Sequence, residues 1–168
     1  MKLTLVDRIF TRLGASDRLL EGKSTFFVEM EECKSIMEHA TPRSLAILDE
    51  LGRGTSTFDG YSLASAVMKH LTLKVRCRSM FSTHYHMLVK DFISHPKVQC
   101  YHMAFKQDKN KKEEITFLYK FIKGACPKSF GINVARMAGI PKSILKVAAE
   151  KSHGFAKKMD LLTKRINN

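Results

Sequence analysis

Two short apolar runs, each followed by polar side chains, constrain the fold of this chain more than any other feature. The runs occupy residues 45–48 and about 77–81, and the polar residues behind them are Asp49, Glu50, Ser82, Thr83 and His84. Short continuous apolar runs are typical of strands that are buried on both faces of a sheet. About 26 residues separate Glu50 from the second run, which is enough for a helical crossover between parallel strands. The pattern predicts an α/β fold with a parallel sheet.

Two stripes of apolar residues at helical spacing support this fold. The first stripe follows the Ser24-Thr25 pair, whose residue types cap helix N-termini, and comprises Phe26, Met30, Cys33, Met37 and Ala40. Glu29 and Glu31 suit the positive end of a helix dipole, so we expect both in the first turn. The second stripe, with Thr57 or Asp59 as the expected cap, comprises Ala64, Val67, Met68 and Leu71.

The acidic pair after the first run has the form of a Walker B element. Ligands of parallel sheets bind beyond the carboxyl ends of the strands, so both polar groups are expected at one edge. There Asp49 would hold Mg²⁺, commonly through water, and Glu50 would orient or deprotonate an attacking water. His84 would lie near Glu50 and sense or polarise a γ-phosphate. The alternative, a zinc pair with His86, lacks partners at ligand spacing, and we assign Tyr85 and His86 to packing or the surface.

A glycine-rich turn directly behind the acids makes this signal far more specific than an apolar run alone. Its residues, which offer backbone N–H groups and three hydroxyls to a phosphate, are Gly52, Arg53, Gly54, Thr55, Ser56 and Thr57. By contrast, residues 22–25 (GKST) resemble the end of a P-loop in these four residues alone. That motif needs a glycine at position 17, where the carboxylate of Asp17 would repel phosphate. We reject a P-loop there and expect Ser24 to be an ordinary N-cap.

Charge and cysteine usage narrow the class of protein. The net charge is +13, of which residues 1–84 contribute +2 (12 basic, 10 acidic) and residues 85–168 contribute +11 (17 basic, 6 acidic). Such an excess suits nucleic acid, although a solvated lysine-rich surface explains it equally well. No cysteine pair has CxxC spacing, so we expect reduced, separate thiols at Cys33, Cys77, Cys100 and Cys126. No apolar run is long enough to span a membrane, and Asp7 and Arg8 interrupt what would be a signal peptide.

The second half reads as a hairpin followed by helices. Residues 97–106 and 115–122 are expected to be extended and joined by a charged turn at residues 107–112, which we interpret as a solvated loop rather than a binding arm. A short helix over residues 131–138 should stop at Gly139. Pro141 should open a last helix that runs to about Lys158.

Four segments together resemble the MutS family of mismatch-repair ATPases. Residues 19–32 (LLEGKSTFFVEMEE), 39–60 (HATPRSLAILDELGRGTSTFDG) and 81–86 (FSTHYH) resemble the signature loop, the Walker B element with its D-loop, and the switch histidine. Residues 121–141 resemble the region after the sheet in this family. Within them, the motif GACPKS is most similar to the eukaryotic MutS-homologue-six branch. The resemblance runs from about Val6 to Lys151.

The resemblance implies a role for each matching residue. Asp49 would help to hold Mg²⁺, Glu50 would activate water, and His84 would be the switch histidine. Ser24 would reach across a dimer interface to the γ-phosphate of ATP bound by the partner subunit. The D-loop residues, which would couple the two nucleotide sites, are Gly52, Arg53, Gly54, Thr55, Ser56, Thr57 and Asp59.

The resemblance also implies a fold and a setting. We expect an ABC-type P-loop NTPase core at residues 1–125 that lacks its N-terminal Walker A part, followed by a helix-turn-helix-like dimerisation segment at residues 126–168. Met1 comes just before the signature loop, so the P-loop and the mismatch-reading domains are expected to be missing, and the isolated chain should bind ATP poorly. A second MutS-family subunit, mismatched duplex DNA contacted through those other domains, and a nuclear location are implied; no membrane is.

Three alternatives remain open. The chain would instead be a non-enzymatic dimerisation or regulatory fragment of the same family if it occupies a partner without hydrolysis. An ABC-type ATPase of chromosome cohesion is disfavoured, because no heptad run is present. Direct DNA binding by the basic second half is expected to be weak and sensitive to salt.

Overall fold

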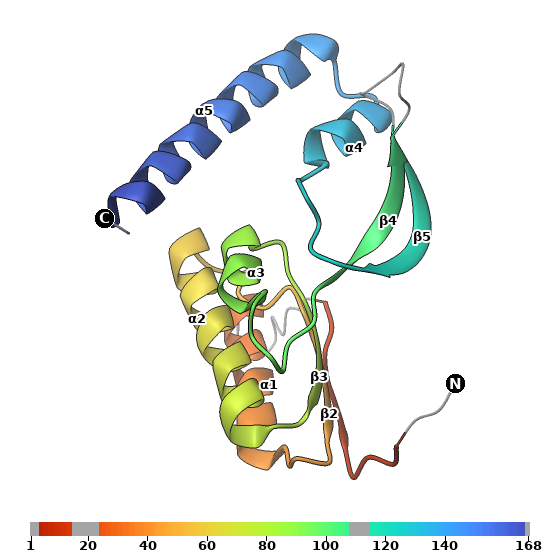
Figure 1. Cartoon of the computed structure of the whole chain (residues 1–168), viewed down its shortest axis with the longest axis vertical. Helices are drawn as coiled ribbons and strands as arrows, with labels where there is room; N and C mark the ends of the chain where they lie inside the picture. Colours follow the sequence, from red (N-terminus) through yellow and green to blue (C-terminus); the bar gives the residue numbers. More distant parts are fainter. Residues whose placement is uncertain (1–3, 15–23, 108–114, 167–168) are drawn as a thin grey trace. The chain divides into compact units, whose positions relative to one another are not determined.

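The computed structural model describes residues 4–14, 24–107 and 115–166 and divides the chain into two compact units, residues 1–99 and 100–168 (Figure 1). The resemblance led us to expect a boundary after residue 125, between an ATPase core and a dimerisation segment. That division stays a prediction.

The first unit is built on a three-stranded parallel sheet in the order β1-β2-β3. Its strands are β1 (Ile9–Arg12), β2 (Leu45–Asp49) and β3 (Arg78–Ser82). The parallel pairing of β2 with β3 confirms the prediction from the two apolar runs. Strand β1 was not expected, because four residues that include a threonine and an arginine do not form an apolar run.

Helices pack on one face of this sheet. Figure 1 shows α1 (Thr25–His39), α2 (Thr57–His70) and α3 (His86–Phe92) on the same side of the strands. Ala46 and Leu48 point into that layer and are fully buried, in a cluster completed by Cys33, Ile36, Leu51, Val67 and Leu71. Burial of each large side chain contributes about 1.5–3 kcal/mol, so this cluster fixes β2 against the helices.

The opposite face of the sheet is only partly covered within the described residues. Ile9 and Met80 lie on that face, and 59% and 55% of their surfaces are exposed. The apolar run at residues 45–48 led us to expect a strand buried on both faces. That expectation is wrong for the described part of the chain, because Leu45 and Ile47 of β2 are only half-buried on this face and the described helices of the first unit pack on the other.

The helix starts are set by serine caps. Ser24 caps α1 as expected, since its hydroxyl accepts a hydrogen bond from the Phe27 N–H at 3.2 Å. Ser56, not Thr57 or Asp59, caps α2. Its hydroxyl accepts from the Asp59 N–H at 3.2 Å and donates to the Asp59 carboxylate at 2.8 Å, so Asp59 is the partner of the cap rather than the cap itself.

The buried face of α1 differs from the expected stripe. Its fully buried residues are Val28, Glu29, Cys33 and Ile36, whereas Met37 is exposed. Glu29 and Glu31 were expected in the first turn, and this expectation is wrong, because the first turn of α1 contains no acidic residue. The Glu29 carboxylate is instead buried and faces Arg12 of β1.

The second unit is a hairpin followed by two helices. Strands β4 (Tyr101–Gln107) and β5 (Ile115–Lys123) pair antiparallel, which confirms the expected hairpin, while most of its turn lies outside the described residues. Helix α4 (Gly131–Met137) ends before Gly139, whose φ of 84° suits glycine. Helix α5 (Lys142–Ile166) continues past the expected end near Lys158. None of the described helices is both long and apolar enough to cross a membrane.

Candidate nucleotide site

The candidate site lies where β2 and β3 end beside each other. Asp49 is the last residue of β2 and pairs in register with Ser82, the last residue of β3. The Ser82 hydroxyl donates a hydrogen bond to the exposed Asp49 carboxylate, and the Glu50 N–H donates to the Ser82 carbonyl at 3.1 Å. The polar residues that follow the two strands therefore share one edge of the sheet.

Glu50 and His84 meet at this edge. His84 Nδ1 lies 3.9 Å from Glu50 Oε1, and Arg53 Nη1 donates to Glu50 Oε2 at 2.7 Å. The side chains of Glu50 and His84 are 38% and 49% exposed, so a ligand in solvent can reach both. The pairing of Glu50 with Arg53 was not expected, since Arg53 had been assigned only to the turn.

The backbone of Glu50 is strained. Its φ of 49° lies in the left-handed region, which costs a residue other than glycine roughly 1–2 kcal/mol. Such outliers persist only where the surroundings hold them and are concentrated at functional sites. Here the Glu50 N–H is bonded to β3, and the Glu50 carbonyl accepts from the Arg53 N–H at 3.2 Å.

The turn behind Glu50 depends on two glycines that touch. A Cβ added to Gly52, whose φ is 90°, would lie 2.5 Å from the Gly60 carbonyl oxygen, and one added to Gly60 would lie 2.3 Å from the Gly52 carbonyl oxygen. Gly54 approaches α1, where an added Cβ would lie 3.1 Å from the Cβ of Phe26. These close approaches explain why the turn is rich in glycine.

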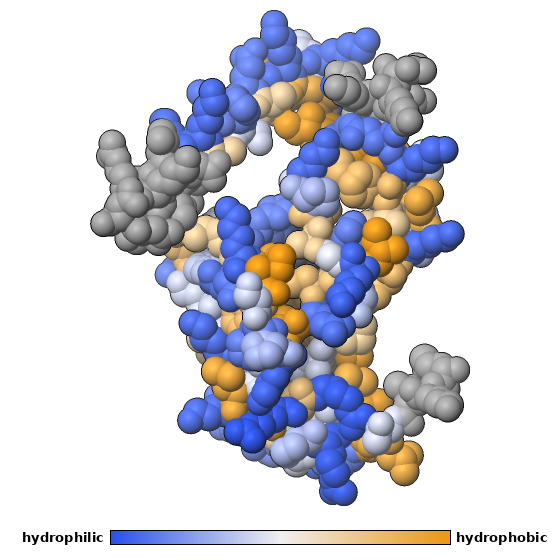
Figure 2. Space-filling model, viewed as in Figure 1, coloured by the Kyte–Doolittle hydropathy of each residue, from blue (hydrophilic) through white to orange (hydrophobic). Residues whose placement is uncertain are grey.

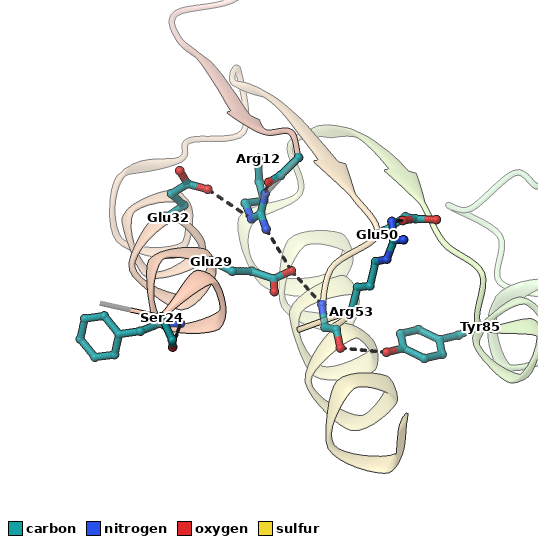
Figure 3. Close-up of polar contacts among 10 residues, drawn as sticks. Arg12, Ser24, Glu29, Glu32, Glu50, Arg53 and Tyr85 are labelled. Atoms are coloured by element: carbon teal, nitrogen blue, oxygen red, sulfur yellow. Dashed lines mark hydrogen bonds and ion pairs between the residues drawn. The ribbon is translucent and has the colours of Figure 1, made fainter. Parts of the chain in front are cut away.

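Two buried side chains bond the backbone of Gly52 from different elements (Figure 3). Glu29 Oε1 of α1 accepts from the Gly52 N–H at 2.9 Å, and the Tyr85 hydroxyl donates to the Gly52 carbonyl at 3.0 Å. Glu29 also faces Arg12, with Nη2 3.5 Å from Oε1, and Arg12 Nε lies 3.2 Å from Glu32 Oε2. The exposed fractions of Arg12 and Glu29 are 5% and 2%, so this ion pair is shielded from water.

Tyr85, which we assigned to packing or the surface, is buried and also hydrogen-bonds the turn. Burial, together with the negative charges of Glu29 and Glu50, raises the pKa of its hydroxyl. The group therefore stays protonated and able to donate to Gly52. Its ring also contacts the ring of His84, with 4.2 Å between centroids.

The remaining predicted residues lie on the turn and the helix starts. Ser24 is exposed at the N-terminus of α1, while Asp17 and the other residues of 15–23 lie outside the described structure. Of the expected D-loop residues, Thr57 and Asp59 belong to the first turn of α2, and the others precede this helix. Thr55 is half-buried within it.

The donor set suits Mg²⁺ held jointly with a phosphate. Within the described ranges, no three His, Cys, Asp or Glu side chains are grouped as a metal site. Mg²⁺ needs no such group, because it keeps several waters and takes one or two carboxylates plus phosphate oxygens. Asp49, exposed and bonded to the Ser82 hydroxyl, fits that requirement.

Reasoning from the sequence missed Arg12, Glu29 and the hydrogen bond of Tyr85. Glu29 did carry a signal, because it lies four residues before Cys33 and therefore on the apolar face of α1. An acid on that face is buried and needs a partner. Arg12 carried no comparable signal.

The geometry defines the class of protein: it has an α/β unit with a parallel sheet and an acidic site at the carboxyl edge of its strands. Comparison then gives the family. The family model for MutS domain V matches residues 1–156, and the chain belongs to the MutS family.

Several relatives are about half identical to this chain. It is 53% identical over 161 residues to the DNA mismatch repair protein Msh6 of Gallus gallus, covering 94% of this chain and 12% of that protein. It is 52% identical to Msh6 of Homo sapiens (93% and 12%) and 50% identical to the DNA mismatch repair protein MutS of Methanococcoides burtonii (87% and 16%). The chain thus spans only a small part of the length of these relatives.

Proposed function

We propose that this chain is the C-terminal part of the ATPase domain of a DNA mismatch-repair protein of the MutS family. It contributes the Walker B acids, the switch histidine and the signature-loop serine to an ATP site shared between two subunits. The observation that carries the proposal is the meeting of Glu50 and His84, 3.9 Å apart, beside Asp49 at one edge of a parallel sheet.

Each residue has a task in this proposal. Asp49 holds Mg²⁺, which when bound neutralises charge on the phosphates. Glu50 accepts a proton from the water that attacks the γ-phosphate, or orients that water. His84, beside Glu50, polarises the same phosphate. Arg53 occupies one oxygen of Glu50 and leaves Oε1 on the side of His84, so Oε1 is the oxygen that meets the water.

The rest of the setting follows from the family. Ser24, exposed at the start of α1, contacts the γ-phosphate of ATP bound by a second MutS-family subunit, and the D-loop couples the two sites. Mismatched DNA is contacted through family domains outside these 168 residues, and the likeness to Msh6 of eukaryotes supports a nuclear location. The 168-residue chain alone binds ATP poorly, because it offers no P-loop to grip the β-phosphate.

The test uses a chimera in which residues 1–156 replace the matching segment of the Gallus gallus relative, purified with a second MutS-family subunit. Glu50→Ala should lower kcat for ATP hydrolysis by about 100-fold or more, the range expected for a general base, while ATP binding persists. His84→Ala should also lower kcat. Lys34→Ala, an exposed change on α1, serves as the matched control and should leave kcat unchanged.

The second candidate, a non-enzymatic dimerisation or regulatory fragment, gives a different result. In that case the partner subunit binds normally and Glu50→Ala changes neither binding nor turnover. Full turnover in the Glu50→Ala chimera would refute the ATPase assignment.

A further inference from the structure

We propose that Glu29 and Tyr85 are positioning residues that clamp Gly52 and thereby hold Glu50 in its working orientation. The pair is called the Gly52 clamp below. The proposal deepens the function proposed above, because it rests on Glu50 acting at the nucleotide site.

The need for a clamp comes from the backbone. Glu50 and Gly52 both have positive φ, 49° and 90°, within one tight turn. A turn that contains a strained residue relaxes unless its neighbours fix it from outside. The bonds of the Glu50 backbone to Ser82 and Arg53 hold one end of this turn, and they leave the Gly52 end to other groups.

The clamp supplies those groups. Glu29 accepts from the Gly52 N–H at 2.9 Å, and Tyr85 donates to the Gly52 carbonyl at 3.0 Å, so both backbone groups of one residue are taken. Glu29 is 2% exposed and Tyr85 is 7% exposed. Water therefore competes little for either bond, and both are stronger than they would be at the surface.

At residue 29, a carboxylate is a better acceptor for the Gly52 N–H than a neutral group. The bond from an N–H to an ionised carboxylate is charge-assisted and directional. Arg12, itself buried, supplies the compensating charge, with Nη2 3.5 Å from Glu29 Oε1. Without that arginine the buried charge would be costly.

The clamp also joins the elements that carry the site. Glu29 lies on α1, whose N-cap is Ser24, and Tyr85 follows His84 directly in the chain. A displacement of α1 is thus passed to Gly52, and from there to Glu50. Figure 3 shows Glu29 and Tyr85 approaching the turn from opposite sides.

The first experiment measures the clamp itself in the 168-residue chain. Amide hydrogen exchange at Gly52, followed by NMR, should be at least about tenfold faster in Glu29→Ala than in the parent chain, because the acceptor is lost. Glu29→Gln keeps an acceptor oxygen and should restore most of the protection. Tyr85→Phe removes the other hydrogen bond to Gly52. Tyr61→Phe is its matched control, because the Tyr61 hydroxyl bonds Asp91 and not the turn.

The second experiment measures positioning in the chimera described above. Tyr85→Phe removes one hydroxyl and keeps the ring, so the protein should fold while kcat falls about tenfold and KM for ATP stays within about twofold. Glu29→Ala should lower kcat in the same way, and Glu29→Gln should rescue it. Tyr61→Phe should leave both parameters unchanged.

The outcomes separate this proposal from the one on which it rests. Unchanged Gly52 exchange in Glu29→Ala would overturn the clamp. Faster exchange with unchanged kcat in both clamp variants would overturn the positioning role. If Glu50→Ala retains full turnover, the proposed function fails instead, and the exchange data still report whether the clamp exists.

Discussion

At the scale of one residue, burial controls the reactivity of the Cys33 thiol. It is 2% exposed, whereas Cys77, Cys100 and Cys126 are all partly accessible. Burial, reinforced by the charge of Glu29, raises the pKa of the Cys33 thiol to about 12. Because the thiolate is the reactive form, Cys33 should react with Ellman's reagent at pH 8 at least about 100-fold more slowly than the other three cysteines.

The other cysteines serve as internal controls for this measurement. In the folded chain three thiols should react quickly and one slowly, and Cys33→Ala should remove the slow phase alone. In 8 M urea all four should react at similar rates. A folded chain with four equally fast thiols would show that α1 does not pack on the sheet.

The polar residues of the site were predictable to different degrees. Asp49, Glu50 and His84 follow apolar runs, and parallel strands bring such residues to one edge whatever the details of packing. Glu29 was assigned to the first turn of α1 because of its charge alone, although the structure buries it one turn further along the helix. Its burial depends on Arg12, and that contact joins segments whose pairing the sequence does not reveal.

At the scale of elements, the turn between β2 and α2 depends on close contact between two glycine backbones. Gly60→Ala places a Cβ 2.3 Å from both the Gly52 carbonyl oxygen and the Tyr85 hydroxyl. Overpacking of this kind costs about 1–3 kcal/mol, so the first unit should unfold more easily. Hydrogen exchange of peptides from residues 45–82, measured by mass spectrometry in increasing urea, reports that loss.

Gly154→Ala is the matched control on another element. Gly154 lies within α5, and an added Cβ would meet no atom within 4 Å. Alanine is the better helix former, so this change should stabilise α5 by up to about 1 kcal/mol. Equal effects of the two substitutions would contradict the glycine contact.

Some elements and element boundaries could not be predicted from local sequence patterns. The parallel pair was predicted from its apolar runs, α1 and α2 from helical periodicity, and the ends of α4 and α5 from glycine and proline, all of which are local signals. Helix α3 was not predicted. Strand β1 was missed and α5 continues beyond the expected end near Lys158, because pairing with β2 in one case and continuous helical backbone in the other outweigh weak local signals.

At the scale of the whole molecule, charge is distributed unevenly along the chain. Residues 85–168 carry 17 of the 29 basic residues and only 6 of the 16 acidic ones. Figure 2 shows hydrophilic residues over most of the α5 surface that is in view, and Lys142, Lys146 and Lys151 on this helix are exposed. Salt-dependent attraction to any polyanion follows from such a distribution.

This asymmetry predicts weak binding of the isolated chain to duplex DNA. Each phosphate contact made by a lysine releases a counterion, so the affinity should fall about tenfold or more between 50 and 200 mM salt. Replacing Lys142, Lys146 and Lys151 by Gln should weaken binding and flatten the slope of log affinity against log salt, as measured by fluorescence anisotropy. Replacing Lys34, Lys69 and Lys74, which are exposed in the first unit, removes the same charge and should change the slope less. Tight binding that persists above 300 mM salt, or equal effects of the two triple variants, would contradict a purely electrostatic origin in the second half and would instead require a shaped DNA site.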